Sequence, residues 1–196
     1  MPSLPPVTKN LLLICTGIFC LQYFVRLEGL FALWPVGSGL FQSWQLLTYA
    51  FLHGGMFHLF FNMLGLWMFG AELERLWGPR RYLHFLLAGV VAAALTQLLV
   101  TWLTNSNVPT VGASGGLFAL LLAFGMLFPN RIIMPLFPPI PMKARTFVML
   151  FGGIELVLGY LDRTGVAHFA HLGGMVGGFL MIRYWRGQSP FSARRR

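Results

Sequence analysis

The chain has 196 residues, of which 57% are hydrophobic and only 10% are charged. A soluble domain carries about 25% charged residues, so this composition excludes a soluble domain and predicts an integral membrane protein. The length suits a single domain over residues 1–196, and the formal net charge of +9 leaves nucleic acid and a membrane surface as candidate partners.

Six apolar runs predict transmembrane helices, since a span needs about 20 mostly apolar residues. These runs are Leu11–Val25, Met56–Leu73, Tyr82–Trp102, Gly112–Phe128, Ala144–Leu161 and Val166–Tyr184. Turn-forming residues separate several of them, namely Gly78-Pro79, the stretch from Asn105 to Pro109, and the proline-rich Phe137–Met142. The predicted fold class is therefore all-α: a membrane protein built as a bundle of six transmembrane helices.

The basic residues are divided unequally between the two sides that these spans define. With a cytoplasmic N-terminus, 12 of the 14 Lys and Arg residues fall on the inner side, and only Arg26 and Arg163 fall on the outer side. Cytoplasmic segments of membrane proteins carry such an excess. The pattern predicts cytoplasmic N- and C-termini, a basic tail at about 185–196 beside the lipid bilayer, and no nucleic-acid partner. The short N-terminus lacks transit-peptide features, which favours a bacterial inner membrane.

The second span begins with two polar residues, His58 and Asn62, which lie four apart and so share one helix face. An imidazole N–H and an amide NH₂ aimed at one point can donate hydrogen bonds to a developing oxyanion. The apolar but interrupted connection before them, from Arg26 to His53, is expected to lie in the membrane interface, with His53 in a structural role.

The fourth span begins with Ser114 inside the run Gly112–Gly116. The run matches the G-x-S-x-G nucleophile elbow of soluble hydrolases, but no strand pattern precedes it, so that fold is rejected. Gly112 and Gly115 leave room for a second backbone or a substrate, and free N–H groups at a helix N-terminus can stabilise an oxyanion. The alternative is a small-residue packing patch, which is common in membrane helices.

The sixth span begins with His168 and His171. His171 lies on one helix face with Ala167, Gly174 and Gly178, and the fourth span offers a matching stripe of Gly115, Ala119 and Ala123. Close packing of these stripes would bring His171 within hydrogen-bonding reach of Ser114. A buried histidine bonded to a carbonyl group is the alternative, and His168 is expected to orient or pack.

The second, fourth and sixth spans all start at the outer face, so their polar residues lie within about 10 Å of that face. This shared depth predicts one site with a serine nucleophile and a histidine base, and with no metal or cofactor. A transporter or metal-binding protein with histidine ligands is the rival interpretation. The absence of H-E-x-x-H and the scarcity of intramembrane carboxylates count against it. Glu155 of the fifth span could partner a histidine or an arginine, or be protonated, and the sequence leaves these open.

Taken together, the motifs resemble those of the rhomboid family of intramembrane proteases, in order and spacing, from about Leu11 to Tyr184. The matching segments are Trp44–Tyr49, the H-x-x-x-N of His58 and Asn62, the G-x-S-G of Gly112–Gly115, and the A-H-x-x-G-x-x-x-G of Ala170–Gly178. Glu74 resembles the acidic residue that the family carries at the inner end of the second helix, where it is expected to be structural.

The resemblance implies a Ser–His dyad without an acid, in which Ser114 attacks and His171 takes its proton. It implies an oxyanion hole formed by the Ser114 N–H with His58 and Asn62. The implied substrates are single-span membrane proteins, cut near the outer end of the span. The fifth helix and Asp162–Gly165 are the candidate gate. An inactive relative acting as a chaperone or binding module is a further alternative.

Two positions depart from the family pattern. Phe118 stands where many members carry tyrosine, so a ring can still pack on His171 but the hydroxyl is lost. Trp44-Gln45 replaces a Trp-Arg pair, which predicts that a lipid or loop contact is missing.

Overall fold

The computed structural model describes residues 3–136, 138–161 and 167–187. The predicted gate loop Asp162–Gly165 and positions 188–196 of the predicted basic tail lie outside these residues. The helical elements are α1 (Pro6–Gln22), α2 (Glu28–Phe31), η1 (Val36–Ser38), α3 (Gln45–Thr48), η2 (Tyr49–Phe51), α4 (Met56–Gly65), the π-helical turn η3 (Leu66–Gly70), α5 (Ala71–Trp77), α6 (Pro79–Thr104), α7 (Ser114–Leu127), α8 (Ala144–Leu161) and α9 (His168–Trp185). Two short strands, β1 (Ile132–Ile133) and β2 (Met142–Lys143), complete the list.

Each predicted span falls on a helix of the described residues, with the second formed by α4, η3 and α5 in series. Within the part of the chain that the structure describes, three helices are long and apolar enough to cross a membrane: Met56–Trp77, Pro79–Thr104 and Ala144–Leu161. The helices α1 and α7 are apolar but shorter. The all-helical membrane class therefore stands, while six complete crossings and the orientation of the termini remain predictions.

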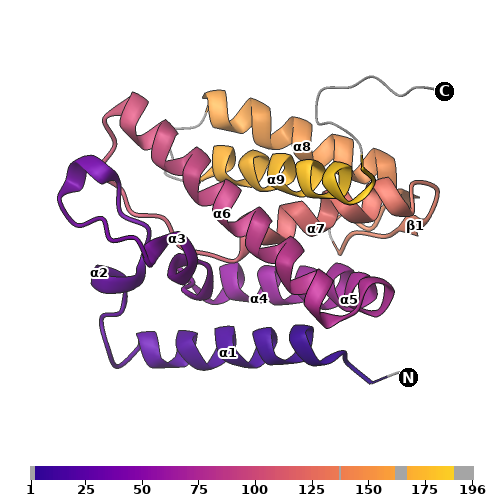
Figure 1. The fold of residues 1–196 in the computed structure, drawn as a ribbon, viewed down its shortest axis with the longest axis horizontal. Coiled ribbons are helices and arrows are strands. Elements are labelled where there is room, and N and C mark those ends of the chain that lie inside the picture. Colours follow the sequence, from indigo (N-terminus) through magenta and orange to yellow (C-terminus); the bar gives the residue numbers. More distant parts are fainter. Residues whose placement is uncertain (1–2, 137, 162–166, 188–196) are drawn as a thin grey trace.

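The helices run roughly along the longest axis of the molecule (Figure 1). The beginning of α1 and the end of α9 lie at the same end as β1, whereas α2 and α3 lie at the opposite end. The helices α4, α7 and α9 all begin toward the end that carries α2 and α3. Their first turns are therefore remote from the chain ends, as the sequence predicts.

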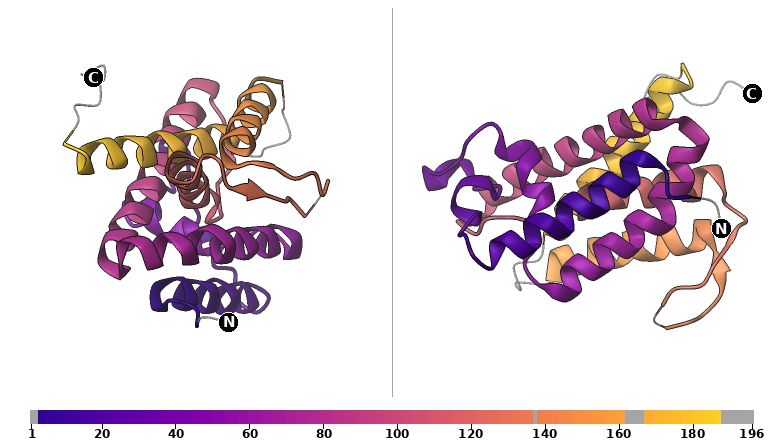
Figure 2. Two further views of the ribbon diagram at one scale, coloured as in Figure 1. Left: turned by 90° about the vertical axis from the view of Figure 1, so that its right-hand side faces the viewer. Right: turned by 90° about the horizontal axis from the view of Figure 1, so that it is seen from below.

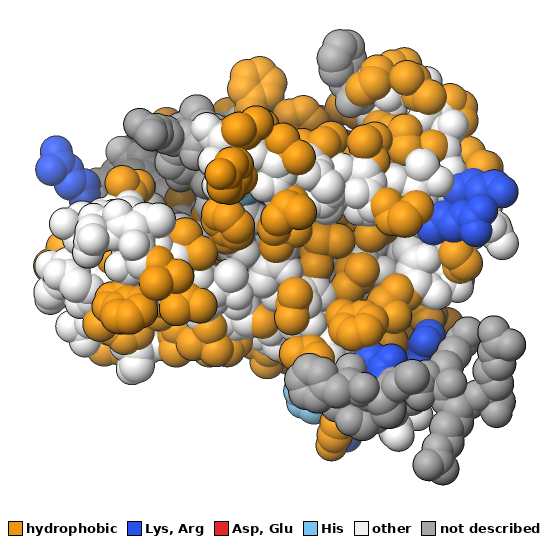
Figure 3. All heavy atoms as spheres, turned by 90° about the horizontal axis from the view of Figure 1, so that it is seen from above, with side chains coloured by type: hydrophobic (Ala, Val, Ile, Leu, Met, Phe, Trp, Pro, Cys, Tyr) orange, Lys and Arg blue, Asp and Glu red, His pale blue; other side chains and the backbone are white. Residues whose placement is uncertain are grey.

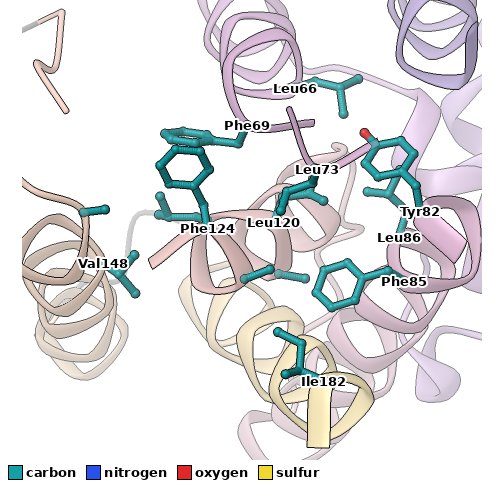
Figure 4. Packing of buried hydrophobic residues seen from close by; sticks show 14 of the residues in the cluster. Leu66, Phe69, Leu73, Tyr82, Phe85, Leu86, Leu120, Phe124, Val148 and Ile182 are labelled. Atoms are coloured by element: carbon teal, nitrogen blue, oxygen red, sulfur yellow. The ribbon is translucent and has the colours of Figure 1, made fainter. Parts of the chain in front are cut away.

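Small residues set the distance between the central helices α6, α7 and α9. A Cβ atom on Gly89 of α6 would overlap Ala119 of α7, and one on Gly178 of α9 would lie 3.1 Å from the Cβ of Ala119. Beside this contact, large apolar side chains such as Phe85, Leu120 and Phe124 fill the space between the helices (Figure 4). The largest buried cluster thus lies between the start of α6, the second half of α7 and the end of α9, and two smaller clusters lie around Leu33 and Phe19.

Outside the core, the helices present hydrophobic side chains to their surroundings. The outer face of α8 exposes Tyr160 at 86%, Leu161 at 68% and Met149 at 66% of their surface. Figure 3 shows hydrophobic side chains over most of one face, with Lys and Arg at its margins. Hydrocarbon is the environment that stabilises such a surface.

The connection between α1 and α4 is a folded segment. A backbone bridge pairs Leu33 with Thr110, and the side-chain amide of the buried Gln45 makes four hydrogen bonds to loop backbone, accepting from Trp34 and Gln42 and donating to Leu30 and Leu40. The sequence comparison with the family pattern predicted a missing contact at Trp44-Gln45. Gln45 organises the loop through its own hydrogen bonds, and the loss of a contact that the family's arginine would make stays a prediction.

Between α7 and α8, strands β1 and β2 form an antiparallel hairpin in which Ile132 pairs with Lys143 and Ile133 with Met142. The sequence predicted only a proline-rich break here, so the hairpin corrects the expectation of a purely helical chain. Figure 2 shows the hairpin projecting beyond the helices.

At the same end, the carboxylate of Glu74 is buried in α5. It accepts hydrogen bonds from the backbone N–H of Val7 (2.8 Å), and from the backbone N–H (2.7 Å) and hydroxyl (2.8 Å) of Thr8. The first N–H groups of a helix have no partner within the helix, so Glu74 caps α1 from another element. The structural role predicted for Glu74 agrees with this geometry.

Candidate active site

Ser114 and His171 lie at hydrogen-bonding distance, with 2.7 Å between the serine Oγ and the histidine Nε2. Ser114 is the first residue of α7, and His171 lies in the first turn of α9. The two residues are 57 positions apart in the sequence, so the contact depends on the packing of the two helices. The sequence predicted this pair, and the structure brings it together.

The glycine stripes account for the short distance between the two helices. A Cβ atom on Gly174, one turn below His171, would overlap the backbone of Gly115. On the other side of α7, a Cβ atom on Gly115 would overlap Ala93 of α6. Larger residues at these positions would push the helices apart and lengthen the Ser114–His171 contact.

His58 of α4 lies beside Ser114 on the lining of the same cavity. The backbone N–H of Gly54 donates to Nδ1 of His58 at 3.3 Å, so in the neutral ring the proton resides on Nε2. That nitrogen faces Gly112: a Cβ atom at position 112 would lie 2.7 Å from it and 3.6 Å from the Oγ of Ser114. His58 is therefore oriented to donate a hydrogen bond beside the serine hydroxyl.

Asn62, one turn further along α4, is 4% exposed and lines the same cavity as His58 and Ser114. Its Nδ2 donates to the backbone carbonyl of His58 at 2.8 Å, which leaves the second N–H of the amide for another acceptor. Its Oδ1 has no hydrogen-bond partner within the described chain. His58 and Asn62 thus line one cavity from the same helix, and their shared role as donors to an oxyanion stays a prediction.

Gly112 adopts a backbone conformation that favours glycine, with φ at 126°. This conformation lets the chain turn from the segment before it into α7, whose first residue, Ser114, lines the cavity. Both a left-handed φ and the proximity of His58 require the absence of a side chain. Gly112 and Gly115 thus have separate roles, one in the turn and one in helix packing.

The ring of Phe118 stacks on the imidazole of His171, with centroids 4.4 Å apart and planes inclined by 5°. The sequence predicted that this ring could pack on the histidine although it lacks a tyrosine hydroxyl. The stacking fixes the plane of the imidazole, and it leaves rotation within that plane to be set by hydrogen bonds.

Glu155 supplies one such hydrogen bond. Its Oε2 lies 2.7 Å from Nδ1 of His171 and 2.7 Å from Nδ1 of His168. The three side chains are mostly buried, with exposed fractions of 12% for Glu155, 13% for His171 and 8% for His168. The sequence left open whether Glu155 partners a histidine or an arginine, and the structure places it against two histidines. The dyad without an acid, which the resemblance implies, stays a prediction. An ionisable residue in the middle of an apolar helix was the available signal, since such residues are usually functional.

His168, Glu155 and His171 are also a geometric candidate for a metal centre, because one ligand atom from each lies within 4.8 Å of the others. In the structure, the contacts of Glu155 with the two imidazoles are already hydrogen bonds, and Nε2 of His171 is taken by Ser114. The arrangement favours a hydrogen-bond network.

His53, by contrast, is buried against His58 and does not line the cavity around Ser114.

A cavity of about 850 Å³ opens beside these residues. Its polar lining comprises His58, Asn62, Thr110, Ser114 and His171, which lie toward one end. It continues between α4 and α8, past Phe61 and Phe151, to Ile133–Leu136 of the hairpin. The cavity is thus a long apolar groove with a polar end, which suits an extended apolar ligand.

These features define a helical membrane protein in which a serine hydroxyl and a histidine lie at hydrogen-bonding distance. Nucleophilic catalysis uses this arrangement. The model of the Rhomboid domain matches residues 40–187, so the chain belongs to the rhomboid family. RHOMBOID-like protein 4 of Arabidopsis thaliana is 38% identical over 141 residues, covering 71% of this chain and 33% of that protein. Rhomboid protease GlpG of Yersinia pestis (strain Pestoides F) is 26% identical over 185 residues, covering 92% of this chain and 62% of that protein. The chain thus spans a third to about three fifths of the length of these relatives.

Proposed function

We propose that this chain is an intramembrane serine protease that cleaves single-span membrane proteins near the outer end of their transmembrane segment. The observation that carries the proposal is the 2.7 Å contact between Ser114 Oγ and His171 Nε2 at the polar end of a long apolar cavity. Membership of the rhomboid family and the protease named among its relatives support the same activity.

In the proposed reaction, the Oγ of Ser114 attacks the carbonyl carbon of the scissile peptide and its proton passes to Nε2 of His171. The negative charge that forms on the carbonyl oxygen is stabilised by the backbone N–H of Ser114 with the side chains of His58 and Asn62. Collapse of this intermediate breaks the C–N bond, and the leaving amine takes the proton from His171. Water then attacks the acyl enzyme while His171 takes one of its protons. His171 returns this proton to the Oγ of Ser114 as the acid product leaves.

The apolar groove between α4 and α8 is the proposed entry for the substrate helix. Its apolar walls match a transmembrane segment, and its polar end holds the reacting groups. Because a helix hides its peptide bonds, the cut requires local unwinding, which favours substrates with Gly or Pro near the site. The gate would then be α8. A bacterial inner membrane with the site near its outer face is the proposed location.

The first test is cleavage of a fluorescent transmembrane peptide by the purified protein in detergent, comparing the wild type with Ser114→Ala and His171→Ala. Removing one member of such a pair costs on the order of 10⁴-fold or more in rate, so both variants should be inactive in this assay. A fluorophosphonate probe should label the wild type and leave Ser114→Ala unlabelled.

The matched control is Ser43→Ala, since Ser43 is exposed in the loop before α3 and lies outside the cavity. It should cleave and label as the wild type does. Cleavage by Ser114→Ala at the wild-type rate would refute the protease proposal. A folded wild type that neither cuts a panel of transmembrane peptides nor reacts with the probe would instead favour an inactive relative that binds membrane proteins.

A further inference from the structure

We propose that Glu155 is a positioning residue that turns the Ser114–His171 pair into a three-membered Ser–His–Glu arrangement, held in place by α8. The inference rests on the proposed function and adds to it a residue for which the implied dyad has no role. Glu155 touches neither the substrate groove nor Ser114, so it acts through His171.

Glu155 selects the tautomer of the base, His171. With the carboxylate 2.7 Å from Nδ1, the imidazole donates its N–H to Glu155 and leaves the lone pair of Nε2 toward Ser114. The hydroxyl of Ser114 then donates to Nε2 over 2.7 Å. A neutral imidazole carries only one ring proton, so the carboxylate selects the tautomer that can accept the proton of the nucleophile.

Glu155 also fixes the orientation of the His171 ring. Stacking on Phe118 holds the plane of the His171 ring, and a hydrogen bond at Nδ1 is what prevents rotation within that plane. The carboxylate itself is held by the second contact of the same oxygen with His168. The position of His168 one turn before His171 suggested an orienting role. In this proposal His168 has that role because it holds Glu155.

Glu155 also stabilises the positive charge that forms on His171. When His171 takes the serine proton it becomes an imidazolium, and a carboxylate at 2.7 Å in a mostly buried site stabilises that charge far more than water-screened pairs do. The proton stays on the imidazole until the leaving amine accepts it, and the carboxylate remains ionised throughout. In soluble serine proteases, the buried aspartate behind the histidine has these functions.

The packing of α8 explains how a glutamate reaches the base. Gly152 and Gly159 lie one turn on either side of Glu155, on the same helix face. A Cβ atom on Gly159 would lie 3.1 Å from the ring of Phe169 and 3.3 Å from the Cβ of His168, and one on Gly152 would lie 3.3 Å from Met175. These two glycines let α8 approach α9 closely enough for the short Glu155 side chain to span both histidines.

The test compares kcat and KM for a transmembrane peptide in the wild type, Glu155→Gln, Glu155→Ala and Glu155→Asp. Glu155→Gln should lower kcat by roughly 10²-fold or more, since the equivalent change in a soluble triad costs about 10⁴-fold, while KM changes less than about twofold. Glu155→Asp keeps the charge and should recover part of kcat, whereas Glu155→Ala should not. The control is Glu72→Gln, which removes a carboxylate from an exposed pair with Arg131 and should match the wild type.

Because Glu155→Gln can also weaken the packing of α8, the thermal unfolding midpoint of each variant is measured in the same detergent. A second variant, Gly159→Leu, should lower kcat by displacing α8, and combining it with Glu155→Gln should add little further loss because both act through the same contact. Additive losses would overturn the proposed path through Glu155.

A kcat within twofold of the wild type in Glu155→Gln would overturn the inference and leave the Ser114–His171 pair untouched. Equal losses in Glu155→Gln and Glu155→Asp, together with lowered unfolding midpoints, would reduce Glu155 to a structural role. Failure of the proposed function has a different signature, namely activity that survives in Ser114→Ala.

Discussion

At the scale of single residues, the proposed site depends as much on missing side chains as on reactive ones. Gly112 has a left-handed φ and faces the Nε2 of His58, the nitrogen proposed to donate to the oxyanion. Gly174 gives α9 access to the backbone of Gly115. A methyl group at either position would disturb a different partner of Ser114, the first on the oxyanion side and the second on the side of the base.

Gly112→Ala should therefore impair the chemical step. The new methyl group would lie 2.7 Å from the His58 ring and force it away from the serine, in addition to straining the backbone. Loss of one oxyanion donor costs about 10²–10³-fold in kcat, and we expect a decrease of that order with KM little changed. Steady-state kinetics on a transmembrane peptide measure it.

Gly37→Ala is the control for this prediction, because a Cβ atom at position 37 would meet nothing within 4 Å and the residue does not have a left-handed φ. It should retain wild-type kcat. If Gly112→Ala also retains wild-type kcat, His58 does not contribute to the oxyanion hole in the way proposed.

At the scale of elements, the helices and the main pair could be predicted because their signals are local or periodic. Apolar runs and breakers give the spans, and the i, i+3, i+4 spacing of glycine and alanine shows which faces of α7 and α9 can approach. That approach determines the Ser114–His171 contact. The oxyanion candidates follow from two polar residues at the start of α4.

The contacts that the sequence could not predict depend on how one element is rotated or docked against another. Glu155 could have faced lipid, an arginine or a histidine, and only the docking of α8 through Gly152 and Gly159 selects the two imidazoles. Likewise, the four hydrogen bonds of Gln45 and the hairpin β1–β2 depend on the tertiary course of loops whose composition indicates only irregular structure.

The attachment of α1 to the bundle is an element-scale property that Glu74 controls. Glu74→Ala would leave the backbone N–H groups of Val7 and Thr8 without their acceptor in a mostly buried place, while the hydroxyl of Thr8 keeps its contact with that of Tyr82 at 3.4 Å. At about 1–3 kcal/mol for each unsatisfied group, we expect a loss of about 3 kcal/mol or more in unfolding free energy. Thermal unfolding in detergent should show a clearly lowered Tm.

Glu72→Ala on the same helix is the matched comparison. Its partner Arg131 is half exposed, and exposed ion pairs contribute about 0–1 kcal/mol, so its Tm should remain close to that of the wild type. Equal Tm values for Glu74→Ala and Glu72→Ala would show that α1 is held by apolar packing alone.

At the scale of the whole molecule, the position of the site relative to the two membrane faces determines which substrate bonds it can reach. The first turns of α4, α7 and α9 lie toward the end with α2 and α3, whereas the start of α1 and the end of α9 lie toward the end with β1 (Figure 1). The excess of basic residues predicts that the end with the start of α1 and the end of α9 is cytoplasmic. The proposed cleavage site would then lie near the outer face.

Single cysteines at the two ends test this orientation in a variant with Cys15 and Cys20 replaced by alanine. Ser43→Cys lies in the exposed loop before α3, and Ser3→Cys precedes α1. In intact cells of a bacterial host, a membrane-impermeant maleimide should label Ser43→Cys once the outer membrane is opened, and should label Ser3→Cys only after the inner membrane is also permeabilised. The reverse pattern would place Ser114, His171 and the polar end of the groove near the cytoplasmic face, and the proposed substrates would then have to be cut from that side.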